Sequence, residues 1–259
     1  MLKNYYKNYT GYLHEGVAYL SSLFKKNTPA GKFFIFTIGR SGSNLLVSLL
    51  NSHPLIGCAN ELLGKPIISP KRYLKNCELL AKKNIYGFKL NTYHFRVQKI
   101  LDPVSFVTEL HQDGYKIISL KRLNLIRQII SHIYAVHRNE FHHDSAKGEL
   151  KQVPMHIDLE YLQAELDKFN AFSDVEASVL RNVPYLPIYY EDDLSDSSDH
   201  QLTVNKVTDF LGIASSVVHT NLVKTTPKEW SSFIENYSEV EEFLVREGYG
   251  EHLEKQIIK

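Results

Sequence analysis

A strand, a glycine-rich turn and a helix follow one another between Lys32 and Pro54, and this arrangement constrains the fold more than any other part of the chain. Residues 33–38 are an apolar run of aromatic and β-branched side chains, which is typical of a buried strand in a parallel sheet. The turn of residues 39–44 is followed by leucines at helical spacing. In this layout, backbone N–H groups and a helix N-terminus converge on one spot, where they bind anions.

Side chains of the turn add further hydrogen-bond donors. An arginine is a bidentate donor to phosphate, and two serines add hydroxyl groups. We therefore expect this turn to bind an anionic ligand through five residues: Arg40, Ser41, Gly42, Ser43 and Asn44.

Two alternatives to a nucleotide-phosphate loop can be weighed for this turn. In a plain strand-to-helix connection, Ser43 or Asn44 would serve only as the helix N-cap. A Walker P-loop does not match, because neither the second glycine nor the lysine of that motif is in place when it is aligned from Gly39. The sequence thus indicates a phosphate-like anion rather than ATP with magnesium.

Composition excludes several classes of protein. The 259 residues include 30 Lys and Arg against 29 Asp and Glu, which does not favour a nucleic-acid-binding surface. Two cysteines, Cys58 and Cys77, do not make a disulfide framework and point to a reducing compartment. Because we find neither a signal peptide nor an apolar run near the ~20 residues that span a bilayer, we expect a soluble, cytoplasmic protein.

Short apolar runs alternate with segments of helical periodicity along most of the chain. This alternation predicts an α/β protein with three layers, P-loop-like, in which helices flank a mostly parallel sheet of about five strands. We expect residues 32–259 to form one domain. Strands are predicted over 33–38, 55–58, 85–90, 115–120 and 185–190, and helices over 71–82, 103–113, 125–138, 158–181, 201–212 and 229–248.

Residues 1–31 stand apart as a basic, amphipathic N-terminal helix. Tyrosines and aliphatic residues recur there at roughly helical spacing, from Tyr5 to Phe24. Such a stripe more often packs on its own domain or on a second subunit than on an anionic membrane surface, so we rank docking ahead of peripheral membrane contact. A homodimer contact is one form that docking could take.

Polar residues gather where the predicted strands end. Glu61 follows the second strand, and Lys89 and His94 lie at the end of the third. Arg122 ends the fourth strand, and Ser131 lies about two turns into the next helix. Because ligands of open α/β sheets bind at the carboxyl ends of the strands, these residues are site candidates. Helix-start or surface charges would explain Glu61 and Arg122 equally well.

Histidines and acidic residues do not suggest a metal site. His132, His137, His142 and His143 lack the spacing of zinc ligands, and we expect a polar loop over 139–147. The acids of 191–193 are typical of a loop after a strand, so no metal is predicted.

Two of these motifs carry a resemblance to a known family. Residues 36–46, FTIGRSGSNLL, look like the 5′-phosphosulfate loop of sulfotransferases that use 3′-phosphoadenosine-5′-phosphosulfate (PAPS). Arg122 and Ser131 look like the 3′-phosphate motif of that family. The resemblance covers roughly residues 33–248 and is greatest to the bacterial branch that includes nodulation-factor and trehalose-type enzymes. Further segments in the order of the family are 60–63, 86–90, 190–194, 209–212 and 234–237.

The resemblance implies a PAPS-dependent sulfotransferase that acts on a hydroxyl group, on a carbohydrate or glycolipid. Arg40 and Ser43 would hold the 5′ side of the nucleotide, with Lys224 from the basic loop of residues 221–228 as a third contact beside the two residues of the 3′-phosphate motif. Arg40 stands where many family members carry a lysine, so it would stabilise charge without donating a proton.

The acceptor hydroxyl needs a base. Glu61 is the preferred candidate, since the trehalose-type enzymes that the chain resembles use a glutamate there; His94 is the alternative, and Lys89 is a candidate sulfate contact.

Two other functions stay open. From the residues alone, the second choice is a P-loop-like nucleoside or nucleotide kinase, and the third is a nucleotide-binding module without catalysis.

Overall fold

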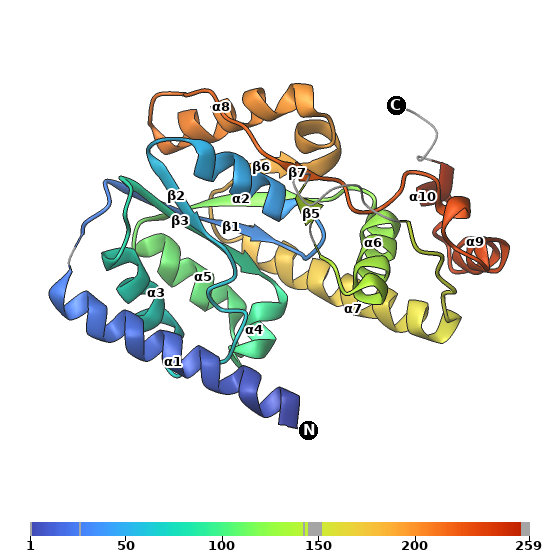
Figure 1. Cartoon of the computed structure of the whole chain (residues 1–259), viewed down its shortest axis with the longest axis horizontal. Helices are drawn as coiled ribbons and strands as arrows, with labels where there is room; N and C mark the ends of the chain where they lie inside the picture. Colours follow the sequence, from blue (N-terminus) through green and yellow to red (C-terminus); the bar gives the residue numbers. More distant parts are fainter. Residues whose placement is uncertain (1, 26, 142, 145–151, 255–259) are drawn as a thin grey trace.

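The computed structural model describes residues 2–25, 27–141, 143–144 and 152–254, and its centre is a five-stranded parallel sheet (Figure 1). The strands lie in the order β2-β3-β1-β4-β6, and each neighbouring pair is parallel. The predicted α/β fold class is therefore confirmed. The strands are β1 (Gly31–Thr37), β2 (Ile56–Ala59), β3 (Ile85–Asn91), β4 (Tyr115–Lys121) and β6 (Leu186–Tyr189).

Helices cover both faces of this sheet. In Figure 1, α2 (Ser43–Ser52) and α8 (His200–Leu211) lie on one face. On the other face lie α3 (Pro70–Leu79), α4 (Tyr93–Val97) and α5 (Pro103–Gln112). A third apolar cluster joins α6 (Leu125–Arg138), α7 (Leu159–Leu180) and α9 (Tyr237–Arg246). Other elements are α1 (Leu2–Phe24), α10 (Gly250–Glu254), and a short antiparallel pair, β5 (His143–Asp144) with β7 (Leu222–Val223). After β6, where the sequence predicted a loop, a turn of π-helix (Tyr190–Leu194) is followed by a 3₁₀ turn (Ser197–Asp199).

The central strand β1 explains why the two faces are both buried. Successive side chains of a strand point to opposite faces. Phe33 and Ile35 accordingly pack with α2 and α8, whereas Phe34 and Phe36 pack with α3, α4 and α5. All four are fully buried, so the apolar run is continuous rather than alternating.

The last predicted helix is wrong in part. Residues 229–248 form a 3₁₀ turn, Trp230–Ser232, followed by α9. Between them, Met155 donates its N–H to the carbonyl of Phe233 at 2.7 Å and accepts from the N–H of Glu235 at 2.9 Å. Asn236 likewise bonds both backbone groups of Ile157, so an extended segment interrupts the helical spacing.

The carboxyl ends of the strands meet at one edge of the sheet. Thr37, at the end of β1, lies beside Asn91 of β3 and Leu120 of β4. The loops that follow these strands therefore open on the same side, as the sequence predicted.

We predict that Gly87→Ala destabilises the protein whereas Gly57→Ala does not. A Cβ at Gly87 of β3 would lie 2.3 Å from the ring of buried Phe33, and a Cβ at Gly57 of β2 would meet only Lys83 at 3.6 Å. Overpacking of this kind costs about 1–3 kcal/mol. Urea unfolding of both variants measures the difference, and equal midpoints would contradict the close packing of β1 on β3.

Candidate active site

The loop between β1 and α2 has two residues in the left-handed backbone region, Arg40 at φ 67° and Gly42 at φ 88°. A Cβ at Gly42 would lie 2.5 Å from the ring of Tyr190, so glycine is required there for space as well as conformation. The left-handed φ of Arg40 is energetically unfavourable for a residue with a side chain, and such strained backbone conformations cluster at functional sites. This backbone shape turns the N-terminus of α2 into the cleft described below.

No described side chain caps the N-terminus of α2. The expected alternative, in which Ser43 or Asn44 is the N-cap, therefore does not hold: Gly42 occupies that position. The first N–H groups of a helix have no partner within it, and they attract negative charge. The loop thus keeps the features of an anion site.

The serines and the asparagine of the loop have different surroundings. Ser41 is fully buried and donates to Thr37 at 2.5 Å, since the Thr37 hydroxyl itself donates to the carbonyl of Leu120 at 2.6 Å. Ser43 and Asn44 line the cleft. The Ser41 hydroxyl is therefore part of the scaffold of the loop, and its expected contact with a ligand stays a prediction.

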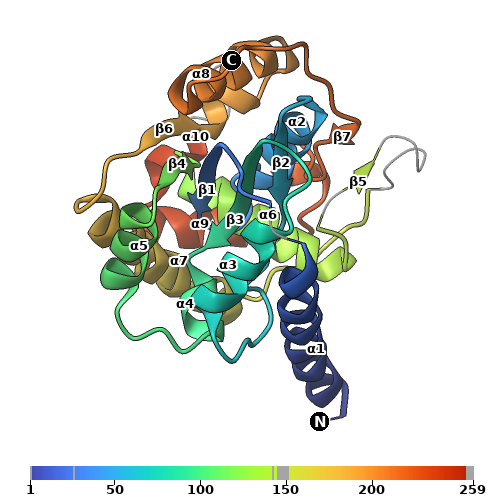
Figure 2. The same ribbon diagram turned by 90° about the vertical axis from the view of Figure 1, so that its left-hand side faces the viewer.

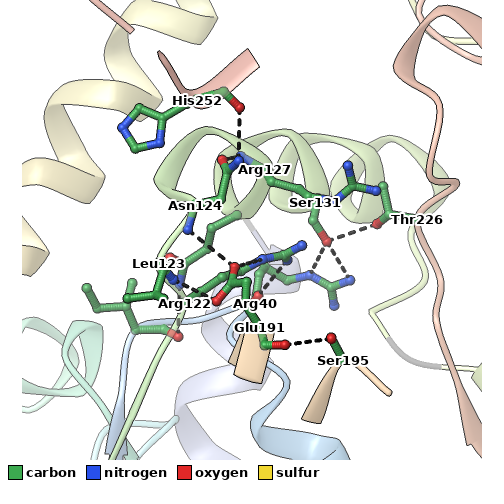
Figure 3. A network of polar contacts seen from close by, with 12 residues as sticks. Arg40, Arg122, Leu123, Asn124, Arg127, Ser131, Glu191, Ser195, Thr226 and His252 are labelled. Carbon is green, nitrogen blue, oxygen red and sulfur yellow. Dashed lines mark hydrogen bonds and ion pairs between the residues drawn. The ribbon is translucent and has the colours of Figure 1, made fainter. Parts of the chain in front are cut away.

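Arg40 lies against residues of α6 and of the basic C-terminal loop (Figure 3). Its Nε and Nη2 donate to the Ser131 hydroxyl at 3.2 and 3.1 Å, and Nη2 also donates to Thr225 at 2.8 Å. Ser131 in turn bonds the hydroxyl of Thr226 at 2.9 Å. The structure therefore brings together the arginine of the first motif and the serine of the second.

Arg122 is the second buried guanidinium of this region. It donates from Nη1 to the carbonyl of Arg40 at 3.1 Å and lies over the ring of Tyr190, 4.8 Å from its centre. Its Nε is 3.7 Å from a Glu191 oxygen and has no hydrogen-bond partner among the described residues. A buried, charged donor without an acceptor is a place where an anionic oxygen would be favourable.

Positive charge accumulates around this point. Burial, and then the neighbouring charge of Arg122, lowers the pKa of Arg40 to about 10, although Tyr190 acts in the opposite direction. Burial likewise lowers the pKa of Arg122 and of Arg127. For Lys224, burial followed by the charges of Arg127 and Arg122 lowers the pKa. These cations lie close enough to repel one another, and a bound polyanion would relieve that repulsion.

Glu191 organises the loop that carries Arg122. Its carboxylate accepts the backbone N–H groups of Leu123 at 2.8 Å and Asn124 at 3.2 Å (Figure 3). Asn124 then caps α6 by accepting the N–H of Arg127 at 2.8 Å. Among the described residues, Glu191 is also the one carboxylate within 4.0 Å of a nitrogen of Arg40, Arg122 or Arg127.

Two arginines of α6 hold the basic loop of residues 221–228 against this helix. Arg127 donates to the carbonyls of Pro227 at 3.4 Å and Lys228 at 3.0 Å, and Arg138 donates to that of Thr225 at 3.4 Å. Lys224 of this loop lines the cleft, and its contact with a nucleotide stays a prediction.

A second polar cluster surrounds Glu61, which is 40% exposed. One carboxylate oxygen lies 3.1 Å from Lys89 Nζ and accepts from the side chain of Asn91 at 3.0 Å. The other accepts from the Tyr93 hydroxyl and lies 4.0 Å from His94 Nε2. Burial alone would raise the pKa of Glu61, but the contacts with His94, Lys89 and Tyr93 outweigh it and hold that pKa far below 4.5.

His94 is fixed in one tautomer. Its Nδ1 accepts the backbone N–H of Asn91 at 3.2 Å, so in the neutral ring the proton is on Nε2, the nitrogen nearer Glu61. Burial lowers the pKa of His94, which favours this neutral form, although Glu61 acts in the opposite direction. His94 is buried and is not among the residues that line the cleft.

Lys89 joins the two clusters. It is 3% exposed, and its Nζ donates to Asn44 Oδ1 at 2.5 Å while lying 3.1 Å from Glu61. One cleft of about 2420 Å³ contains both clusters. Its lining includes Arg40, Gly42, Ser43, Asn44, Glu61, Lys89, Arg122, Ser131 and Lys224.

Some residues of the site had no role assigned from the sequence. Tyr190 lies beside Arg122, Asn91 and Tyr93 donate to Glu61, and Arg127 contacts the basic loop. Tyr93 and Asn91 are neighbours of His94 at the end of β3, and that position is the one signal that could have identified them.

Other histidines and acids of the chain have local partners, and of these His132 also lines the cleft. His137 contacts the carbonyl of Pro154, His132 lies 3.6 Å from Glu165, and Asp193 accepts from Lys206 at 2.5 Å. His142 lies outside the described residues. Within the part of the chain that the structure describes, no three His, Cys, Asp or Glu side chains gather as a metal site would need.

Comparisons with known proteins show similarity in fold but not in sequence. The sequence matches no protein-family model and no curated protein. The fold is similar to that of a sulfotransferase from Alicyclobacillus acidocaldarius, with a TM-score of 0.50 at 13% identity over 88% of this chain and 96% of that one. Mouse sulfotransferase SULT7A1 complexed with PAP scores 0.44 at 16% identity, covering 74% of this chain and 62% of that one. The sulfotransferase domain of the Synechococcus PCC 7002 olefin synthase scores 0.43 at 15% identity, covering 73% and 76%.

We predict a pH-dependent contribution of Glu61 to stability. Because the pKa of Glu61 in the folded protein lies below its ordinary value of 4.5, the ionised group stabilises the fold above about pH 4.5, and this contribution is lost as the pH falls further. The free energy of unfolding of the protein should therefore exceed that of Glu61→Gln by more at neutral pH than at about pH 3. Urea unfolding at both pH values measures this, and a constant difference would contradict it.

Proposed function

We propose that this protein is a sulfotransferase that moves the sulfuryl group of PAPS to an acceptor hydroxyl, with Glu61 as the base. The observation that carries the proposal is the cluster of buried cations at Arg40 and Arg122, beside an uncapped helix N-terminus in the same cleft. A ligand with two separate phosphate groups could place one at the helix N-terminus and the other beside the buried cations. The order of the two motifs along the chain and the fold of the Alicyclobacillus protein are compatible with it.

The donor fits the residues that are present. Backbone N–H groups at the start of α2, with Ser43, would bind the 5′-phosphosulfate. Arg122 and Ser131 would bind the 3′-phosphate, and the Nε of Arg122 is a donor without a hydrogen-bond acceptor among the described residues. Arg40 spans the two positions, because its backbone belongs to the loop and its guanidinium reaches Ser131. Lys224 would add charge from the basic loop.

Glu61 suits the role of base better than His94. The accepting nitrogen of His94 is already bonded to the N–H of Asn91, and its other nitrogen carries the proton. His94, Asn91 and Tyr93 then act as positioning residues, since they orient the carboxylate. A carboxylate with a lowered pKa is a weak base. In a loose transition state, however, the bond from the acceptor oxygen to sulfur forms late, and the oxygen becomes acidic as that bond forms, so a weak base can take its proton.

In the proposed reaction, the acceptor oxygen forms a bond to sulfur while the bond from sulfur to the bridging phosphate oxygen breaks, and the acceptor proton passes to Glu61. Lys89 lies between the loop and the base, where its charge would stabilise the sulfuryl group in transfer. The protein then contributes positioning and charge rather than covalent chemistry. The acceptor we propose is a hydroxyl of a carbohydrate or glycolipid.

Calorimetry of the purified protein with 3′-phosphoadenosine-5′-phosphate, AMP and ATP with magnesium tests the donor site. We expect the bisphosphate to bind about a hundredfold more tightly than AMP, because two charge-assisted contacts to the 3′-phosphate contribute roughly 3 kcal/mol. Arg122→Ala should abolish this preference, whereas Arg181→Ala, at the exposed end of α7, should keep it. A preference for ATP with magnesium would favour the kinase and overturn the proposal.

Substitution of the two candidate bases tests the chemistry. In a screen of glycans and glycolipids with labelled PAPS, Glu61→Gln should lower kcat by about 10²–10⁴-fold while the affinity for the bisphosphate product is unchanged. His94→Gln should cost less, because it alters only the orientation of Glu61. A larger loss of kcat in His94→Gln than in Glu61→Gln would make His94 the base.

A further inference from the structure

The N-terminal helix α1 contacts the rest of the protein through its smallest residues. Gly11, Ala18 and Ser22 are buried, at spacings that place them on one face of the helix with Glu15. A Cβ at Gly11 would lie 2.2 Å from the carbonyl oxygen of Pro66, which shows how closely the backbones approach. The helix therefore docks on its own domain, but not through the aromatic and aliphatic stripe that the sequence suggested.

Hydrogen bonds fix this docked position. Glu15 accepts the backbone N–H groups of Ile68 and Ser69, both at 2.8 Å. Ser22 donates to Asn76 of α3 at 3.2 Å. Figures 1 and 2 both place α1 at the periphery, outside the helices that cover the sheet.

The opposite face of α1 is apolar and turned to solvent. Leu13, Val17, Leu20 and Phe24 recur at the spacing of one helix face and are 65%, 63%, 59% and 87% exposed. We call these four residues the outer face of α1. A surface helix normally packs its apolar stripe against the core of its domain. In α1 the apolar stripe faces solvent, and the small residues face the domain. Contiguous exposed apolar surface of this kind marks an interaction site.

The charges of this segment indicate the partner. Residues 2–25 contain Lys3, Lys7 and Lys25 and one acid, Glu15, whose carboxylate oxygens already accept two backbone N–H groups. A second copy of the helix would offer no acid to pair with these lysines. An anionic lipid surface attracts lysines and accommodates leucine, valine and aromatic side chains at the same time.

We propose that the outer face of α1 binds the surface of an anionic lipid bilayer. The proposed contact is peripheral, because it involves only the outer face of α1. Among the described residues no helix is long and apolar enough to cross a membrane. This inference goes beyond the proposed function and does not depend on it, because it rests on α1 alone.

Sedimentation of the full chain with lipid vesicles tests the proposal. We expect binding to vesicles of phosphatidylcholine and phosphatidylglycerol in equal amounts, weakening as salt is added, and little binding to phosphatidylcholine alone. The double variant Val17→Glu, Leu20→Glu should bind at least about tenfold more weakly, because two side chains can no longer enter the interface. Both positions are exposed, so the variant should fold.

Leu202→Glu is the matched control. Leu202 is 61% exposed, about as much as Leu20, and belongs to α8 on the opposite side of the molecule in both views (Figures 1 and 2). This variant should bind the vesicles as the unchanged protein does. All three proteins should also bind 3′-phosphoadenosine-5′-phosphate equally, which separates this test from that of the proposed function.

Three outcomes would overturn the proposal. One is the absence of binding to anionic vesicles, and another is equal binding to neutral and anionic vesicles. The third is a lipid-free dimer, seen by analytical ultracentrifugation, that the double variant converts to a monomer, because the partner of the outer face would then be a second copy of the chain.

Discussion

The buried positive charge at the carboxyl end of the sheet is the constraint on which the arrangement of the site depends. Burial, and then the neighbouring charge of Arg122, lowers the pKa of Arg40, so the buried charge is unfavourable. Three contacts of Arg122 oppose this effect: the carbonyl of Arg40 itself, the ring of Tyr190 and the carboxylate of Glu191. These groups come from the loops after β1 and β6, so the sheet must hold β1, β4 and β6 in their observed order for Arg122 to be tolerated.

Sequence patterns predicted the centre of the sheet well because β1 and β3 are buried on both faces. The continuous apolar run of β1 can satisfy its backbone only between two other strands, and its side chains only between two helical layers. Periodicity failed where a long-range contact competed with it. Asn236 bonds the backbone of Ile157, 79 residues earlier, and α9 begins only after it, so the helix that spacing predicts from residue 229 is interrupted. For α1 the spacing identified the stripe, but it did not show that small residues such as Gly11 form the docking face.

The candidate site also has residues that the sequence identified and others that it did not. Arg40 and Ser131 could be identified because each lies in a motif, and they meet in the structure although 91 residues separate them. The groups that hold the motifs in place could not be identified, because their contacts are equally remote and no local pattern records them. Glu191 reaches the backbone of Leu123 across 68 residues, and before that contact is known it is one acid in a run of three. The direction of a side chain was also beyond the sequence, as the inward-facing hydroxyl of Ser41 shows.

Lys89 explains why the two polar clusters can serve one reaction. It lies on β3, directly beside β1 and level with Ile35, so its ammonium group extends from the sheet between the loop after β1 and the residues after β2. There it donates to Asn44 and pairs with Glu61, so that it links the anion-binding loop to the candidate base. A buried lysine with two such partners keeps the two groups at a fixed separation. The proposed in-line transfer of a sulfuryl group would need the leaving and attacking oxygens to be held in this way, and it would therefore depend on the strand order β2-β3-β1.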